Sequence, residues 1–250
     1  GGAKLAGVPS AQGKLTVQGL QAAIDAHPPL PPHVMPRSVL SLSQATELGT
    51  VYTAGELAAL TAWARSQALK VHMDGARFAN AVVSTGASAA ELSWKAGVDL
   101  LSFGATKNGA LAAELLLVFD DALAEGLAPR QKRAGHLWSK QRYLAAQLLA
   151  YLEDDLWLRL AAHANAQAQR LSEGLAALPG VSLEAPTEAN EVFVHLPVPL
   201  QQALREAGAT FYPWHAPGLS PSETRVRLVT HHATAPEDVE AFLALAQQSV

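Results

Sequence analysis

The sequence contains no cysteine. Disulfide bonds, thiol catalysis and cysteine-ligated zinc are therefore excluded for this chain, and the composition fits a reducing compartment, so we expect a cytoplasmic protein. No apolar run is long enough to cross a membrane, and the first residues lack the charged start and apolar stretch of a signal peptide. We expect no membrane partner.

Neither sign of charge predominates, because the chain has 18 Lys and Arg and 22 Asp and Glu, for a net charge of −4. The chain has no long block of like charges, which leaves no basic stripe for nucleic acid. With 250 residues, 49% of them hydrophobic, it can bury one large core, or a large and a small one. We expect a small molecule as its partner.

Several motifs of common enzyme classes are missing. There is no P-loop, no dinucleotide-binding glycine fingerprint and no Gly-x-Ser-x-Gly elbow, which disfavours phosphoryl transfer, hydride transfer and serine hydrolysis. The chain opens at Gly1, and its only methionines are Met35 and Met73. We therefore expect an N-terminal truncation, with part of any active site upstream.

Strand-like and helix-like segments alternate through the first half of the chain, which predicts an α/β fold with a mostly parallel sheet covered by helices. Thr53 and Glu56 have the spacing of a capping box at a helix start. The expected strands are 38–42, which we interpret as buried, 70–73, 98–103 and 115–119, and the expected helices are 14–26, 53–69 and 88–97.

The second half begins with a helical pattern, broken at Asp154 and Asp155. Short strands are expected at 181–183, 191–196, 210–212 and 225–229, with helices at 199–207 and from a cap at Thr234 to the end. We interpret residues 1–136 as part of a large α/β domain, 137–178 as connecting helices and 179–250 as a small C-terminal α+β domain.

Two motifs carry the chemistry, HMDGAR at 72–77 and SFGATKNG at 102–109. Each follows a strand-like run, so Asp74, Arg77 and Lys107 would emerge at the carboxyl ends of neighbouring parallel strands, where open α/β sheets bind ligands. Pyridoxal phosphate needs such a set, because a lysine forms a Schiff base with its aldehyde and a carboxylate keeps its pyridine nitrogen protonated. The two motifs predict a site for this cofactor.

Each of these side chains also has a simpler interpretation. Asp74 could cap the turn that Gly75 favours, Arg77 could form a surface salt bridge, and Lys107 could be an exposed loop lysine. The pairing of Asp74 and Lys107 on adjacent strands favours the cofactor site. In that case Asp74 would be poorly solvated, and partial burial or a nearby positive charge would lower the pKa of Lys107.

Other strand-end residues are weaker candidates. Arg225 and Arg227 alternate along one strand and so face the same side, which predicts a guanidinium clamp for a carboxylate, with a solvated edge strand as the alternative. The turn at 47–50 follows the first strand and is a further candidate.

Histidines suggest a metal site at two places, His72 with Asp74 and His231 with His232. Residues one or two apart in a strand rarely converge on one ion, and no third ligand is evident. We expect no metal.

Four stretches of the chain, 72–77, 101–109, 132–140 and 227–231, resemble the low-specificity L-threonine aldolases, which are fold-type I, aspartate-aminotransferase-like pyridoxal phosphate enzymes. The resemblance extends over essentially the whole chain, and four motifs in the right order make it specific. It implies that Lys107 is the Schiff-base lysine, that Asp74 partners the pyridine nitrogen, and that Arg77 and Arg227 hold the substrate carboxylate.

The resemblance also implies an activity and an assembly. The activity is retro-aldol cleavage of L-threonine, L-allo-threonine and related β-hydroxy-α-amino acids to glycine and an aldehyde, and the assembly is a homotetramer or dimer with sites between subunits. Members of the family carry an N-terminal phosphate-binding turn and a histidine stacked on the cofactor, which have no counterpart here. We therefore expect a separate N-terminal segment as a partner, and the general base stays unassigned.

Three alternatives stay open. Another fold-type I reaction, such as β-elimination or transamination, would use the same Lys107 and Asp74. A catalytically incomplete fragment would bind no cofactor, and a metal-dependent aldolase would keep its activity without Lys107.

Overall fold

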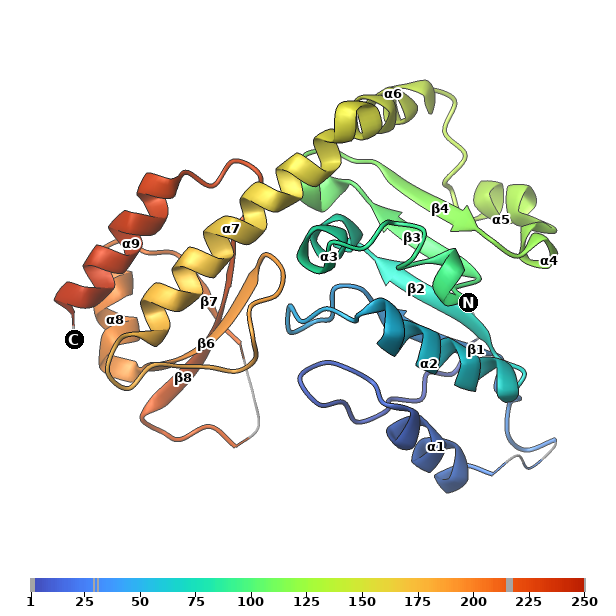
Figure 1. Ribbon diagram of the computed structural model, residues 1–250, viewed down its shortest axis with the longest axis horizontal. Helices are drawn as coiled ribbons and strands as arrows, with labels where there is room; N and C mark the ends of the chain where they lie inside the picture. Colours follow the sequence, from blue (N-terminus) through green and yellow to red (C-terminus); the bar gives the residue numbers. More distant parts are fainter. Residues whose placement is uncertain (1–2, 29, 31, 215–217, 250) are drawn as a thin grey trace.

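Two β-sheets joined by one long helix make up the structure (Figure 1). This computed structural model describes residues 3–28, 30, 32–214 and 218–249. The strands are β1 (Val39–Ser43), β2 (Lys70–Gly75), β3 (Leu100–Gly104), β4 (Glu114–Val118), β5 (Ser182–Leu183), β6 (Glu191–Pro197), β7 (Tyr212–Pro213) and β8 (Glu223–Val229). The order is β1-β2-β3-β4 in the first sheet and β5-β6-β8-β7 in the second.

Helices connect and cover these strands. They are α1 (Val17–Ala26), α2 (Ala54–Ser66), α3 (Phe78–Thr85), α4 (Asp121–Ala124), α5 (Leu127–Arg133), α6 (Arg142–Leu152), α7 (Leu156–Ala176), α8 (Val198–Glu206) and α9 (Pro236–Gln248), with short 3-10 turns η1 (Trp94–Ala96), η2 (Thr106–Asn108) and η3 (Glu153–Asp155). None of the helices within the described ranges is long and apolar enough to cross a bilayer.

The first sheet is mixed. Strands β1, β2 and β3 are parallel, as predicted, whereas β4 runs antiparallel to β3. The reversal has a simple cause, because parallel neighbours need a crossover of about a dozen residues or more. The connection from Gly104 to Glu114 is shorter than that and returns as a hairpin.

Only one face of the first sheet is buried in this chain. The strand predicted as buried at 38–42 is buried on one face only, because exposed and buried side chains alternate along β1. The buried face packs against α1, α2 and α3 in one hydrophobic core, which includes Leu40, Leu42, Val71, Met73, Leu101 and Phe103. The opposite face carries polar side chains that solvent reaches, among them Ser41, His72 and Asp74.

The second sheet is antiparallel throughout its described strands. Helices α7 and α8 lie against β6, and α9 packs on α7. Its core contains Val192, Val194, Leu196 and Val226 from the strands and Leu171, Leu175, Leu200 and Leu204 from the helices. This part has the α+β character that the pattern predicts.

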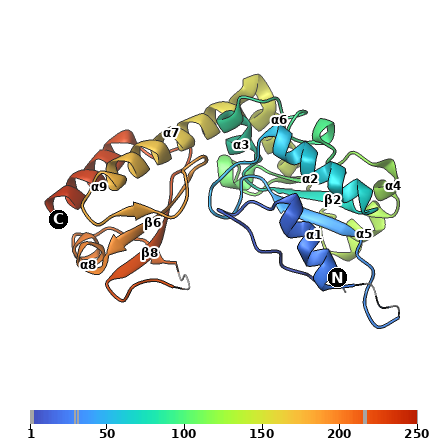
Figure 2. The same cartoon turned by 60° about the horizontal axis from the view of Figure 1, so that its bottom comes forward.

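Helix α7 belongs to both cores. Trp157 and Ala161 near its start lie in the first core, and Ala168 and Leu171 lie in the second. Figure 2 shows α7 running from the helices of the first sheet to the second sheet. The predicted break before it is confirmed at η3, where Asp154 and Asp155 have left-handed backbone angles. The division into domains at 1–136, 137–178 and 179–250 stays a prediction.

Two of the predicted helices differ from those of the structure. The helix at 53 begins with the full capping box but ends at Ser66, because Ala68 has a φ of 54° that no helix continues. The helix predicted at 88–97 is absent, and Ser88 and Glu91 cap a series of turns instead. Those turns end in η1, which stops at Gly97 with a φ of 98°.

The C-terminal helix also starts differently, because its N-cap is Ala235 rather than Thr234. The hydroxyl of Thr234 instead accepts a hydrogen bond from the backbone N–H of His231. Helices α4 and α5 follow β4 and were not predicted.

Candidate active site

The two motifs lie at one edge of the first sheet. Strands β2 and β3 are parallel neighbours, and their register pairs Asp74 with Ser102. Lys107 follows at the end of β3 in η2, and Arg77 is the residue directly before α3. The structure therefore brings Asp74, Arg77 and Lys107 to the carboxyl ends of adjacent strands.

Asp74 is exposed, contrary to the expectation of a poorly solvated carboxylate. Its Oδ1 accepts a hydrogen bond of 2.9 Å from the backbone N–H of Ala76, so it caps the turn after β2 as the simpler interpretation predicts. The carboxylate also remains open to a ligand from the polar face of the sheet.

His72 lies on the same face, between two hydroxyl groups. Its Nδ1 is 2.8 Å from Oγ of Ser41 and its Nε2 is 3.0 Å from Oγ of Ser102. Burial lowers the pKa of His72, and the negative charge of Asp74 opposes this effect in part. A neutral imidazole therefore stands beside Asp74 near neutral pH.

The turn that carries Lys107 is anchored by its neighbour Asn108. The buried amide of Asn108 donates hydrogen bonds of 2.6 Å to the hydroxyl of Tyr151 and 2.9 Å to the carbonyl of Trp157. Burial raises the pKa of Tyr151 to about 12, so this partner stays protonated. Lys107 itself is exposed, so partial burial, one of the two expected settings for this lysine, is not seen, and its amine projects from a backbone that Asn108 holds in place.

Glycine allows the strand ends to approach closely. A Cβ added at Gly104 would lie 2.7 Å from Cα and 2.8 Å from the carbonyl oxygen of Ala76. The turn after Asp74 and the turn before Lys107 can therefore pack in direct contact only because position 104 has no side chain.

The two predicted substrate arginines meet at one carboxylate. Nη2 of Arg77 lies 3.1 Å, and Nη2 of Arg227 lies 2.8 Å, from the same Oε1 of Glu191. The Glu191 side chain is 1% exposed, whereas those of Arg77 and Arg227 are 11% and 24% exposed. Two cations, one from each sheet, thus share a buried anion.

Strand register explains why Glu191 and Arg227 are neighbours. Phe193 on β6 pairs with Arg227 on β8, and Glu191 pairs with Val229. Glu191 and Arg227 are therefore diagonal partners on one face of the antiparallel pair, within reach of long side chains. Their contact follows from the register of β6 and β8.

Arg225 faces the same side of β8, as the alternation predicts, but has a different partner. Its Nη1 lies 3.2 Å from Glu184, and its guanidinium stands over the ring of Phe193, while that of Arg227 stands over Trp214. Strand β8 lies between β6 and β7, so the alternative of an edge strand is wrong. Of Arg225 and Arg227, only Arg227 is placed with Arg77 at the carboxylate of Glu191.

Further charges surround Glu191. Burial raises the pKa of Glu191, and the charges of Arg77 and Arg227 oppose it, with a smaller lowering by Lys107. Glu47 acts in the raising direction, which places the predicted turn at 47–50 beside the site. At Gly49, where φ is 76°, a Cβ would lie 2.9 Å from the backbone oxygen of Glu191.

Sequence reasoning missed Glu191 and its neighbour Asn190. The stretch 191–196 was assigned only to a strand, although a glutamate that opens an apolar strand needs a cationic partner once it is buried. Asn190 accepts a hydrogen bond of 3.0 Å from Nε of Arg77 and donates one of 2.6 Å to the carbonyl of Thr230. Both residues hold Arg77 against the second sheet.

The histidines considered for a metal have other neighbours. His231 accepts a hydrogen bond at Nδ1 from the backbone N–H of Ala233, and its ring stands edge-on to that of His232. Across the ranges that the structure describes, no group of three His, Asp or Glu side chains is arranged to hold a metal ion.

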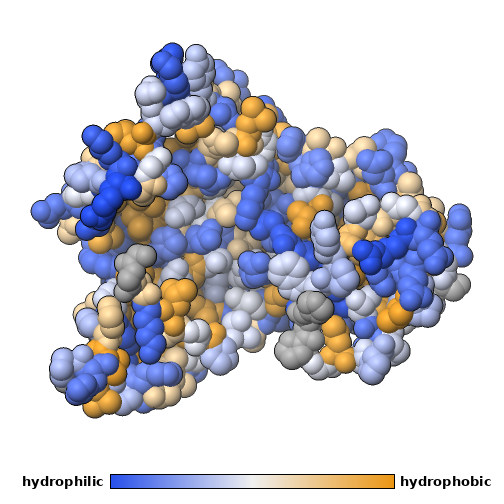
Figure 3. All heavy atoms as spheres, turned by 180° about the vertical axis from the view of Figure 1, so that it is seen from behind, coloured by the Kyte–Doolittle hydropathy of each residue, from blue (hydrophilic) through white to orange (hydrophobic). Residues whose placement is uncertain are grey.

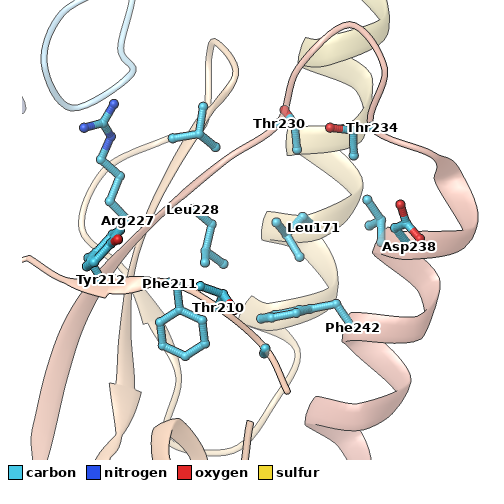
Figure 4. A pocket seen from close by; sticks show the side chains of 13 residues that line it. Leu171, Thr210, Phe211, Tyr212, Arg227, Leu228, Thr230, Thr234, Asp238 and Phe242 are labelled. Atoms are coloured by element: carbon cyan, nitrogen blue, oxygen red, sulfur yellow. The ribbon is translucent and has the colours of Figure 1, made fainter. Parts of the chain in front are cut away.

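A separate cavity of about 370 Å³ lies in the second-sheet part, between β8, α7 and α9. Figure 4 shows its apolar side chains, Leu171, Phe211 and Phe242, and shows the guanidinium of Arg227 turned away from them. Arg227 therefore belongs to the site at the sheet edge rather than to the interior of this cavity.

Comparison with known proteins identifies the family. A family model described as beta-eliminating lyase matches residues 1–198. The chain belongs to this family. It is also 48% identical over 215 residues to a low specificity L-threonine aldolase of Pseudomonas aeruginosa, and the match covers 84% of this chain. The resemblance seen in the four motifs is thereby confirmed.

Solved structures of other proteins have the same fold as this member of the beta-eliminating lyase family. A threonine aldolase of Leishmania major superposes with a TM-score of 0.91 at 28% identity, covering 99% of this chain and 70% of that one. An aspartate aminotransferase of Rhodobacter sphaeroides superposes with a TM-score of 0.64 at 20% identity, covering 97% and 64%. The fold is that of the fold-type I enzymes, and the chain spans 60% of the length of the Pseudomonas relative.

Proposed function

We propose that this protein is a pyridoxal-phosphate-dependent aldehyde-lyase that cleaves L-threonine, L-allo-threonine and related β-hydroxy-α-amino acids to glycine and an aldehyde. The observation that carries the proposal is the common sheet edge of Lys107 and Asp74, with Arg77 and Arg227 beside it. The names of the matched relatives support it.

The side chains at this edge suit pyridoxal phosphate. Lys107 offers an exposed amine for the aldehyde, and Asp74 offers an exposed carboxylate on the adjacent strand for the pyridine nitrogen. When bound, the cofactor draws electrons from the α-carbon of an amino acid and so makes a bond to that carbon breakable. Asn108 would keep the lysine turn in place during this chemistry.

Arg77 and Arg227 would orient the substrate through its carboxylate. A guanidinium can donate two parallel hydrogen bonds to a carboxylate, and a grip from two sides restricts rotation about the α-carbon. That orientation selects the bond to be broken, here Cα–Cβ. The β-hydroxyl loses its proton as the aldehyde leaves, and the α-carbon takes up a proton to give glycine.

The test compares wild type, Lys107→Ala and, as a control on another exposed lysine, Lys95→Ala, each with added pyridoxal phosphate. We expect wild type and Lys95→Ala to develop visible absorbance and to form glycine and acetaldehyde from threonine, and Lys107→Ala to do neither. Equal spectra for all three would reject Lys107. A wild type that develops no visible absorbance would favour a catalytically incomplete chain.

A second candidate, β-elimination, is favoured by the description of the matching family. From threonine this reaction would release ammonia and 2-oxobutyrate instead of glycine and acetaldehyde. Product analysis of the same wild-type incubation separates the two reactions.

We further propose a cytoplasmic homo-oligomer, a tetramer or a dimer. Helix α6 presents the large apolar side chains Tyr143, Leu149 and Leu152, which are 58%, 74% and 45% exposed. On the face seen in Figure 3, hydrophobic residues are also scattered among hydrophilic ones at the surface. Light scattering after size-exclusion chromatography, with Leu149→Lys as the variant expected to weaken association, tests this assembly.

A further inference from the structure

Glu191 contacts both arginines assigned to the substrate, and its setting in the protein is unusual. Both carboxylate oxygens of Glu191 are buried and lack hydrogen bonds of good geometry. Nε of Arg227 is likewise buried and donates no hydrogen bond of good geometry. The contacts of 3.1 Å and 2.8 Å are thus ion pairs rather than aligned hydrogen bonds. Charge, more than hydrogen-bond geometry, holds this cluster together.

The position of Glu191 between two like charges has a physical consequence. Arg77 comes from the edge of the first sheet and Arg227 from the second sheet, and two guanidinium groups this close would repel each other. A carboxylate oxygen shared by both converts the repulsion into attraction. The distance between the arginines therefore depends on Glu191.

The exposure of the three side chains shows from which side a ligand can approach. Glu191 is buried beneath the arginines, and both guanidinium groups are partly accessible. Contacts with Glu191 and Asn190 use Nη2 and Nε of Arg77 and Nη2 of Arg227. Because each guanidinium has five N–H donors, these contacts between described residues leave Nη1 of both arginines for a second carboxylate.

We propose that Glu191 is a positioning residue, an internal carboxylate that sets the spacing of Arg77 and Arg227 and so preforms the clamp for the carboxylate of the substrate. The assignment of that ligand rests on the proposed function, whereas the spacing role does not. Among the described residues, the ion pairs of Glu191 are with Arg77 and Arg227, and it acts through these two arginines.

The first test needs no cofactor and uses a small carboxylate as the probe. In Glu191→Ala, sodium acetate should occupy the space between the arginines and raise the midpoint of thermal unfolding saturably, by about 3 °C or more. Sodium chloride at equal ionic strength and acetamide should not. The matched control is Glu184→Ala, which removes the partner of Arg225 and leaves Arg77 and Arg227 intact.

The proposed role of Glu191 can be overturned in two ways. If acetate stabilises Glu191→Ala no more than it stabilises wild type and Glu184→Ala, the spacing role is wrong. If Glu191→Ala does not fold, the isosteric variant Glu191→Gln is compared with Glu184→Gln. Glu191→Gln should then lose affinity for glycine, measured calorimetrically on the cofactor-loaded protein, by about tenfold or more relative to that control, and unchanged affinity would overturn the proposal.

The second test uses the cofactor-loaded protein with threonine. Glu191→Gln should raise KM by about tenfold or more and lower kcat by a smaller factor, because the clamp binds the substrate carboxylate and also orients the bond to be broken. Glu184→Gln should leave both constants near those of wild type. A fall in kcat at constant KM contradicts the proposal, whereas a wild type that forms no glycine contradicts only the proposed function, and the acetate experiment still decides the role of Glu191.

Discussion

Nε of Arg77 donates a hydrogen bond of 3.0 Å to Oδ1 of Asn190, a residue that the other sheet holds in place. Asn190 in turn donates to the carbonyl of Thr230, and Arg77 also contacts Glu191. The Arg77 side chain, at the edge of the first sheet, is thus bound by Glu191, the first residue of β6, and by Asn190, which directly precedes it. This link ties the candidate site to the packing of the two sheets.

Arg77→Ala should therefore destabilise the protein. It leaves the buried Glu191 with one cation and Asn190 with an unused acceptor, so we expect a loss of about 3–5 kcal/mol in the free energy of unfolding. Urea denaturation measures it. The double variant Arg77→Met with Glu191→Met should recover part of the loss, and a single variant within about 1 kcal/mol of wild type would show that the cluster contributes little.

Asn108→Ala should loosen the turn that carries Lys107. The substitution leaves the buried hydroxyl of Tyr151 and the carbonyl of Trp157 without their donor, which costs about 1–3 kcal/mol. We also expect weaker visible absorbance with pyridoxal phosphate at limiting cofactor. Tyr151→Phe, which removes only one partner, is the milder control, and a larger effect of Tyr151→Phe than of Asn108→Ala would contradict this account.

Gly104→Ala and Gly55→Ala should have opposite effects. The new methyl at 104 would overlap Ala76, so we expect a loss of about 1–3 kcal/mol. At Gly55, in the first turn of α2, the nearest atom is 4.0 Å away, and alanine should stabilise by about 0.5–1 kcal/mol. Thermal or urea unfolding of the two variants side by side is the measurement, and destabilisation by both would contradict the packing argument.

His72 should make stability depend on pH. Burial holds its folded-state pKa below the ordinary value of 6.5, so the unfolded chain binds the proton more readily. The stabilisation is complete above the ordinary value of 6.5 and is lost as the pH falls from there through the lower pKa of the folded state. Asp74→Asn removes the opposing charge and should lower the pKa further, which NMR titration of the imidazole can follow.

The control for this titration is His72→Gln. Its unfolding midpoint should vary less than that of wild type between neutral pH and mild acid, because the titrating ring is gone. A rise of the His72 pKa in Asp74→Asn would show that the carboxylate of Asp74 does not raise the pKa of the imidazole.

Much of the first sheet was predictable because its signals are local. The apolar runs before Asp74 and Lys107 set two adjacent parallel strands, and the Thr53 and Glu56 box set a helix start. The placement of Asp74, Arg77 and Lys107 at neighbouring strand ends was therefore predictable from local patterns, whereas their roles stay a prediction. Their exposure was not predictable, because the accessibility of a strand end depends on which elements cover the sheet.

Glu191 could not be predicted in the same way, because its importance arises from long-range geometry. It reaches Arg227 through the antiparallel register of β6 and β8 and reaches Arg77 through the approach of α3 to the second sheet. The strand at 115–119 was placed well, but its direction depends on the short return from Gly104, which strand patterns do not encode.

Helix α7 has a consequence for how the protein melts. Its 21 residues form one helix, whose hydrogen bonds form cooperatively, and its two halves supply apolar side chains to separate cores. Loss of either core would strip half of the helix of its packing and fray the remainder. Calorimetry should therefore record a single heat-absorption peak, although the strands themselves are divided between two sheets.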